Sequence, residues 1–97
     1  MEILAKLHDA SLLSLALCWS EGLCSIDLKG GPSQPGRFFL VFSGVSNLEV
    51  PRSLSWGPSD SVLEAKSPAP GHFEIHMQSG DIIGIHAAAC AVEYPGT

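Results

Sequence analysis

Residues 14–29 read SLALCWSEGLCSIDLK, two runs of apolar and β-compatible residues on either side of Glu21 and Gly22. Glycine readily adopts the positive φ of a tight turn, so the pattern predicts a β-hairpin in which Glu21-Gly22 is a two-residue loop. Counting outward from that loop sets Trp19 opposite Cys24. The predicted apolar face consists of Leu15, Leu17, Trp19, Cys24, Ile26 and Leu28, and mostly polar or small residues alternate with them on the other face.

A second hairpin is expected further along the chain. Ser79-Gly80 forms its turn, between a strand at 72–78 and a strand at 81–92. Counting outward from this turn places His86 in the core, opposite Phe73. The predicted core face pairs Met77 with Ile82, Ile75 with Gly84 and Phe73 with His86.

The last predicted strand is apolar on both faces. Ile83 and Ile85 would point away from the core, so a second sheet, a helix at residues 1–10 or a second subunit must cover them. Residues 87–91 have a weak preference for β structure and could be helical, but the preceding Ile-Ile-Gly-Ile favours a strand.

The middle of the chain supplies further strands. Residues 29–36 hold three glycines and two prolines and are expected to form a loop. Residues 37–43 are continuously apolar between their ends, which is typical of a central strand covered on both faces. Gly44 marks a bulge or turn before a shorter strand at 45–50.

These elements predict one mainly β domain over residues 1–97. Its antiparallel hairpins would form a small β-sandwich, roll or partly open barrel, with at most one short helix. Whether residues 1–10 form that helix or an edge strand stays open at this point.

The composition of the chain limits the classes of function that it can have. The chain has 45% hydrophobic and 15% charged residues and a formal net charge of −5. Nucleic-acid binding draws most of its affinity from clustered Lys and Arg, and the five cations here are scattered, so we expect no nucleic-acid partner.

The cysteines and the apolar run near the start indicate the compartment. Three cysteines without paired spacing are not a disulfide framework, and we expect them to be small buried apolar residues and not reactive thiols. Residues 10–18 resemble a short export signal, but acidic residues precede them and Leu17 before Cys18 is too large for a cleavage site. Since no apolar run approaches the ~20 residues that span a bilayer, we expect a cytoplasmic protein without membrane contact.

Histidines are the first candidates for chemistry. His72 and His76 share a strand face but would lie about 13 Å apart, too far to bind one ion, so we expect no metal and no other cofactor. His8 and Asp9 form a local pair, although Asp9 could simply stabilise a turn. A core-facing His86 is more often a hydrogen-bonded core residue than a catalyst. No known catalytic motif is present, which argues against an enzyme.

The connection at 51–61 is long for a compact domain and carries candidate binding residues. Arg52, Trp56 and Asp60 lie in it, and Trp and Arg are enriched at binding hot spots. The alternative, which we favour, is that Trp56 plugs the open end of the sheet, since a large aromatic side chain is usually buried.

Four short segments carry a resemblance that spans nearly the whole chain. They are His8-Asp9-Ala10, Phe42-Ser43-Gly44-Val45, Trp56-Gly57-Pro58-Ser59 and Met77-Gln78-Ser79-Gly80-Asp81. This pattern resembles a group of small uncharacterised bacterial all-β proteins. The first segment also resembles the opening of small immunity proteins that neutralise toxins. The resemblance implies a bacterial, cytoplasmic setting and assigns no catalytic residue.

Two functions from different classes follow. The first is a non-enzymatic interaction module that binds a protein partner, as an immunity protein does, or its own copy as a homodimer. The second is a small enzyme or ligand-binding protein with a polar site from His8, Asp9, Arg52, Asp60 and His86. The second requires at least three of these side chains to converge on one point.

Overall fold

The computed structural model describes residues 2–32, 35–53 and 60–95. Within these ranges one short 3-10 helix precedes eight strands. The elements are η1 (Glu2–Lys6), β1 (Ser11–Cys18), β2 (Leu23–Lys29), β3 (Arg37–Ser43), β4 (Asn47–Glu49), β5 (Val62–Ala69), β6 (His72–Met77), β7 (Ile82–His86) and β8 (Ala89–Glu93). No helix of the described ranges is long and apolar enough to cross a membrane.

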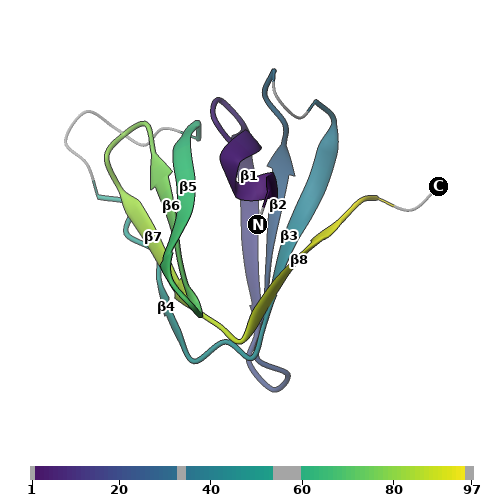
Figure 1. Cartoon of the computed structure of the whole chain (residues 1–97), viewed down its shortest axis with the longest axis vertical. Helices are drawn as coiled ribbons and strands as arrows, with labels where there is room; N and C mark the ends of the chain where they lie inside the picture. The colour runs from purple at the N-terminus through teal and green to yellow at the C-terminus, as the bar shows by residue number, and fades with distance from the viewer. Residues whose placement is uncertain (1, 33–34, 54–59, 96–97) are drawn as a thin grey trace.

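The strands form two four-stranded antiparallel sheets. The first sheet has the order β1-β2-β3-β8, and the second has the order β4-β7-β6-β5. Figure 1 shows that the two sheets are inclined to each other as the two arms of a V, with η1 between the arms. The predicted mainly β fold with at most one short helix is therefore confirmed, as two packed sheets that do not close into a barrel.

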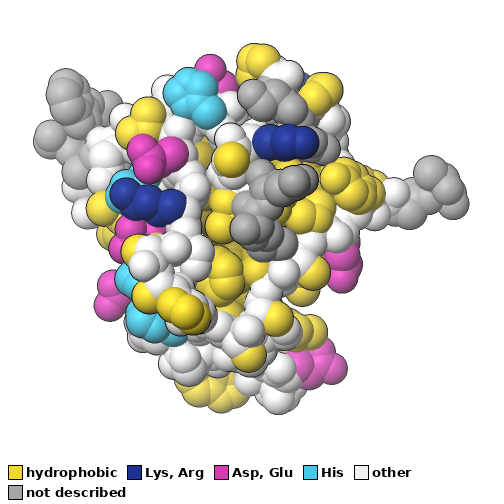
Figure 2. Space-filling model, viewed as in Figure 1, with side chains coloured by type: hydrophobic (Ala, Val, Ile, Leu, Met, Phe, Trp, Pro, Cys, Tyr) yellow, Lys and Arg dark blue, Asp and Glu magenta, His cyan; other side chains and the backbone are white. Residues whose placement is uncertain are grey.

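The core lies between the two sheets. β3 is a central strand, as expected, but it is not fully covered on both faces: Phe38, Leu40 and Phe42 are fully buried, whereas the residues that alternate with them are only half-buried. The segment around η1 contributes Leu4 and Leu7 to the same core, so the start of the chain fills the opening between the arms of the V. Figure 2 shows the apolar side chains that occupy this space.

The first hairpin has the predicted faces but a longer turn. Cys18 pairs with Leu23, so the loop holds the four residues 19–22 instead of two. The pairing is therefore shifted by two residues, and a shift of two keeps every paired side chain on its face. Gly22 has a φ of 64° at the end of the loop. The one residue misplaced by the prediction is Trp19, which leaves the strand and joins the turn.

The last hairpin also has a longer turn, and here the prediction of the faces is wrong for one strand. The amide of Met77 donates to the carbonyl oxygen of Asp81 at 2.8 Å, so the loop holds the three residues 78–80. Gly80 has a φ of 104°, as in the three-residue hairpin turns that need a glycine. One extra loop residue shifts the pairing by one step, which exchanges the two faces of β7.

The exchanged faces of β7 give a better-packed sheet. Ile83 and Ile85 pair with Ile75 and Phe73 and are buried. Ile82 is 42% exposed, and His86 lies on the outer face beside His72. His86 is therefore not a core residue, and the second sheet packs its isoleucines against the first sheet without a further cover.

The expected single strand at 81–92 is also wrong, because the chain changes sheets in its middle. β7 belongs to the second sheet and β8 to the first, and the bend lies at Ala87-Ala88. Beside it, the chain crosses in the other direction from β3 to β4 at residues 44–46. The amide of Ala88 donates to Ser43 and that of Ser46 donates to His86, at 2.9 and 2.8 Å. The two crossings, at 44–46 and 87–88, thus form one hydrogen-bonded unit, which we call the corner.

Candidate functional site

His8 and Asp9 build a turn between η1 and β1. The Nδ1 of His8 hydrogen-bonds to the carbonyl oxygen of Leu63 at 2.7 Å, and its Nε2 lies 3.5 Å from Oδ2 of Asp9. Gln78 donates from Nε2 to Oδ1 of Asp9 at 2.6 Å. Asp9 has a φ of 65°, a left-handed conformation that suits a turn. The two side chains are in contact with each other. His8 is also hydrogen-bonded to β5 and Asp9 to Gln78, so both side chains fix the turn against the rest of the fold.

Arg52 and Asp60 lie in a second place. Both are exposed, and they line a cavity of about 740 Å³ together with Asp81. Asp81 is largely buried, accepts a hydrogen bond from Ser79 Oγ at 3.2 Å, and sits 3.5 Å from the amide of Ser53. Trp56, the third candidate of this connection, lies outside the described residues.

His86 occupies a third place, on the outer face of the second sheet. Its ring stacks on that of His72, with centroids 4.5 Å apart and an interplanar angle of 14°. The cavity lined by Arg52 and Asp60 includes neither His8, Asp9 nor His86 among its described lining residues. The five polar candidates are therefore distributed over three places and do not converge on one point.

His72, His76 and His86 form a polar row with Glu74 on that outer face. Nε2 of His76 lies 3.0 Å from Oε1 of Glu74, and Nε2 of His72 lies 3.5 Å from Oε2. Glu74 thus lies between the two histidines that the sequence places on this face. Within the described ranges, no group of three His, Cys, Asp or Glu side chains is arranged to hold a metal ion.

We expect the stability of the fold to depend on the ionisation of Glu74. The hydrogen bond to His76 lowers the pKa of Glu74, and the positive charges of His72, His76 and Lys66 add to this against the opposing effect of partial burial. Because the pKa is lowered in the folded state, ionised Glu74 stabilises the fold above its ordinary pKa of 4.5, and this contribution is lost as the pH falls through the folded-state value.

We therefore expect the thermal midpoint of the wild type to fall more steeply than that of Glu74→Gln between about pH 5 and pH 3. Thermal unfolding followed by circular dichroism measures both curves. Glu64→Gln, a matched change on the neighbouring strand, serves as the control and should follow the wild type. If the thermal midpoints of Glu74→Gln and the wild type fall equally with pH, the histidines do not stabilise the ionised carboxylate of Glu74.

The thiols differ in exposure. All three cysteines are free. Burial raises the pKa of Cys24 and raises that of Cys90 to about 11, so both stay protonated at neutral pH and behave as small apolar residues, as expected. Cys18 is exposed at the end of β1, so the same expectation is wrong for it.

A pocket of about 470 Å³ lies where the turn of the first hairpin meets the chain that leaves β3. We call it the hairpin-tip pocket. The amide of Val45 donates to the carbonyl oxygen of Gly22 at 3.0 Å, which ties its two walls together. Its lining residues are Leu17, Trp19, Gly22, Val45, Ser46, Asn47 and Leu48.

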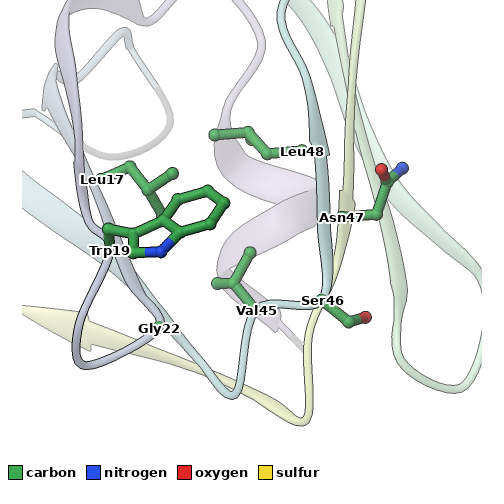
Figure 3. A pocket seen from close by; sticks show the side chains of 7 residues that line it. All are labelled: Leu17, Trp19, Gly22, Val45, Ser46, Asn47 and Leu48. Carbon is green, nitrogen blue, oxygen red and sulfur yellow. The ribbon is translucent and has the colours of Figure 1, made fainter.

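The walls of the hairpin-tip pocket are apolar. Figure 3 shows Trp19 and Leu17 on one side, facing Val45 and Leu48 on the other. The indole of Trp19 is 88% exposed, although burial of so large an apolar surface normally favours folding. An exposed tryptophan beside an apolar hollow is the arrangement found at binding sites.

Two acidic residues are close in sequence to the residues that line this pocket. Glu21 is exposed in the same turn as Trp19, and Glu49 is exposed directly after Leu48. No lysine or arginine is among its lining residues or their sequence neighbours. The residues that line the pocket and their neighbours in the sequence thus include two acidic side chains and no basic one.

Trp19 is the residue that the sequence prediction missed as a site. Placing it on the core face required a two-residue turn. A four-residue turn is the alternative that keeps the same faces for every other residue of the hairpin. The run Trp-Ser-Glu-Gly, with two polar residues in its middle, is the signal that fits such a turn.

Because Trp19 packs so little against the fold, we expect Trp19→Ala to change the free energy of unfolding by no more than about 0.5 kcal/mol. Urea denaturation measures the difference. Leu28→Ala, at a fully buried position of the same hairpin, should lose about 2–5 kcal/mol. A loss of similar size in Trp19→Ala would place the indole in the core and contradict its exposure.

No protein-family model, no curated protein and no solved structure matches this chain.

Proposed function

We propose that the protein is a non-enzymatic interaction module whose hairpin-tip pocket receives an apolar side chain of a protein partner. The observation that carries the proposal is the exposed indole of Trp19 beside the apolar walls formed by Val45 and Leu48. Tryptophan is among the residues that contribute most to binding when a partner covers them. The distribution of the polar candidates over three places supports a role without catalysis.

The charge of the chain defines the partner further. The formal net charge is −5, and two of the five cations are engaged, Arg37 in an ion pair with Asp27 and Lys66 with Glu64. Together with Glu21 and Glu49, which are close in sequence to the residues that line the pocket, this net negative charge favours a basic partner surface. The proposed partner therefore presents an apolar anchor surrounded by Lys or Arg.

A bacterial, cytoplasmic setting and an immunity-like role belong to the same proposal. They rest on the sequence resemblance of the segments quoted above. An acidic module that neutralises another protein by covering a basic surface fits that role.

The test is calorimetric titration of the purified protein with short peptides. The probe is acetyl-Lys-Lys-Leu-Lys-Lys-amide, and the comparison peptides replace Leu by Ser or every Lys by Glu. We expect binding of the first peptide, weaker binding of the other two, and a decrease in affinity with added salt. Trp19→Ala should lower the affinity at least about tenfold, which corresponds to about 1.4 kcal/mol.

The matched control for the variant is Leu63→Ala, which removes an exposed apolar side chain that does not line the pocket. It should bind like the wild type. If Trp19→Ala binds as well as Leu63→Ala, or if the lysine and glutamate peptides bind equally, the pocket is not the contact site and the proposal fails.

A further inference from the structure

The two sheets end in four edge strands, and three of them are protected against pairing with another chain. An unprotected edge offers a row of backbone groups to any partner strand. β1 has an irregular register between Leu12 and Ser14, and its first residue, Ser11, forms an isolated bridge with Ser61, directly before β5. β4 has only three residues and is followed by Pro51.

β5 is the third protected edge. Its register is irregular in two places, it contains Pro68, and it carries the exposed charges of Glu64 and Lys66. The amides of Asp9 and Val62 also donate hydrogen bonds that join the start of β5 to the segment before β1. Bulges, prolines and charges are the devices by which soluble proteins keep edge strands from pairing.

β8 has the regular register that β1 and β5 lack and is longer than β4, although Pro95 follows two residues after its end as Pro51 follows β4. Its five residues, Ala-Cys-Ala-Val-Glu, pair with β3 in an unbroken register from Ala89 to Glu93. It contains no proline and one charge, and in the described part of the chain no strand pairs with its other edge (Figure 1). In a regular antiparallel strand, alternate residues direct their amide and carbonyl groups away from the neighbour. The outer edge of β8 therefore offers backbone groups to a further strand.

We propose that a second copy of this chain pairs with it, β8 against β8 and antiparallel, to form one sheet of twice the width. Two identical edges meet in this way across a two-fold axis, which needs no second type of surface. With Ala91 on the axis, Cys90 of one copy lies opposite Val92 of the other, and Glu93 lies opposite Ala89. The apolar residues Cys90 and Val92 pack on the inner side of the sheet, so the pairing extends that side.

The single charge of β8 is compatible with this pairing. In that register the two Glu93 side chains are four residues apart along the strands, about 13 Å, which exceeds the screening length of about 8 Å at physiological salt. The outward side chains of Ala89 and Ala91 are small and do not obstruct a neighbour. A contact of five residues buries little surface, so the dimer forms only at high protein concentration.

The test is sedimentation velocity of the full chain over a concentration series from about 10 µM to 1 mM, the range in which a contact this small should associate. The wild type should change from monomer to dimer across the series. Ala91→Lys places two ammonium groups opposite each other at the axis and should stay monomeric, since like charges directly opposite are unfavourable. Circular dichroism confirms that the variant is folded.

Ala16→Lys is the matched control, the same change at an exposed position on the opposite edge strand of the same sheet. It should dimerise like the wild type. A wild type that stays monomeric throughout overturns the inference, as does a dimer that Ala91→Lys leaves intact. A dimer lost in Trp19→Ala but kept in Ala91→Lys would assign self-association to the hairpin-tip pocket and equally overturn the role of β8.

Discussion

Replacing Phe42 by alanine is expected to lower the free energy of unfolding by about 3–5 kcal/mol. Phe42 lies on the central strand β3 and is fully buried. Its ring packs edge-on against Phe73 of the second sheet, with centroids 5.2 Å apart and an interplanar angle of 64°. The substitution therefore removes both a large apolar surface and an aromatic pair that joins the two sheets.

Urea denaturation monitored by circular dichroism measures this loss. Phe39→Ala is the control, because Phe39 lies on the same strand but on its outer, half-buried face. It should lose clearly less. Equal losses for the two variants would mean that β3 is covered equally on both faces, which is incompatible with two sheets that enclose Phe42.

The second large effect is expected at the corner, from Gly44→Ala. Gly44 has a φ of 64°, where an L side chain is strained, and a Cβ built there would lie 2.7 Å from Cβ of Ala88. The backbone strain alone costs about 1–3 kcal/mol, and the contact adds to it because the two crossing segments must move apart. We expect the loss to exceed that of a glycine-to-alanine change inside a strand.

Two further variants separate the backbone strain at Gly44 from the close contact with Ala88. Gly84→Ala, in the middle of β7, meets no atom within 4 Å and has no positive φ, so its stability should change little. Ala88→Gly in the Gly44→Ala background removes the close contact and should recover part of the loss, leaving the backbone strain. Full stability in Gly44→Ala itself would contradict the close crossing of the two segments. Thermal unfolding of the four proteins measures these differences.

The sequence indicates the faces of the strands more reliably than their partners. Alternation of apolar and polar residues placed Ile26 and Ile75 on the core side, and the structure buries both. The alternation of apolar and polar residues does not determine how many residues the loop contains. A four-residue loop in place of two keeps the faces, as in the first hairpin, whereas a three-residue loop exchanges the faces of one strand, as for His86.

The change of sheets at the corner depends on contacts between distant segments. Gly44 was recognisable as a turn from its lack of a side chain. The bend at Ala87-Ala88 was not, because nothing local distinguishes it from a continuing strand. It exists because residues 43 and 46, distant in sequence, hydrogen-bond to its two sides.

In the candidate site, too, local features could be predicted from the sequence, whereas contacts between distant segments could not. Arg52 and Asp60 lie at the two ends of one connection, and the structure places them on one cavity. The contact between His8 and Asp9 is local. What sequence alone could not give is the distance between such groups, and with it the conclusion that they do not converge. Nor could it place Leu48 opposite Trp19, since that juxtaposition depends on the corner.

Acrylamide quenching of Trp19 fluorescence tests the central claim most directly, namely that this indole is exposed and available to a partner. Trp56→Phe leaves Trp19 as the single tryptophan of the chain. In the free protein we expect Trp19 to be quenched nearly as strongly as in the urea-unfolded protein, and the lysine-leucine peptide should protect it. An indole already shielded in the free protein, or one whose quenching the peptide leaves unchanged, would contradict the account.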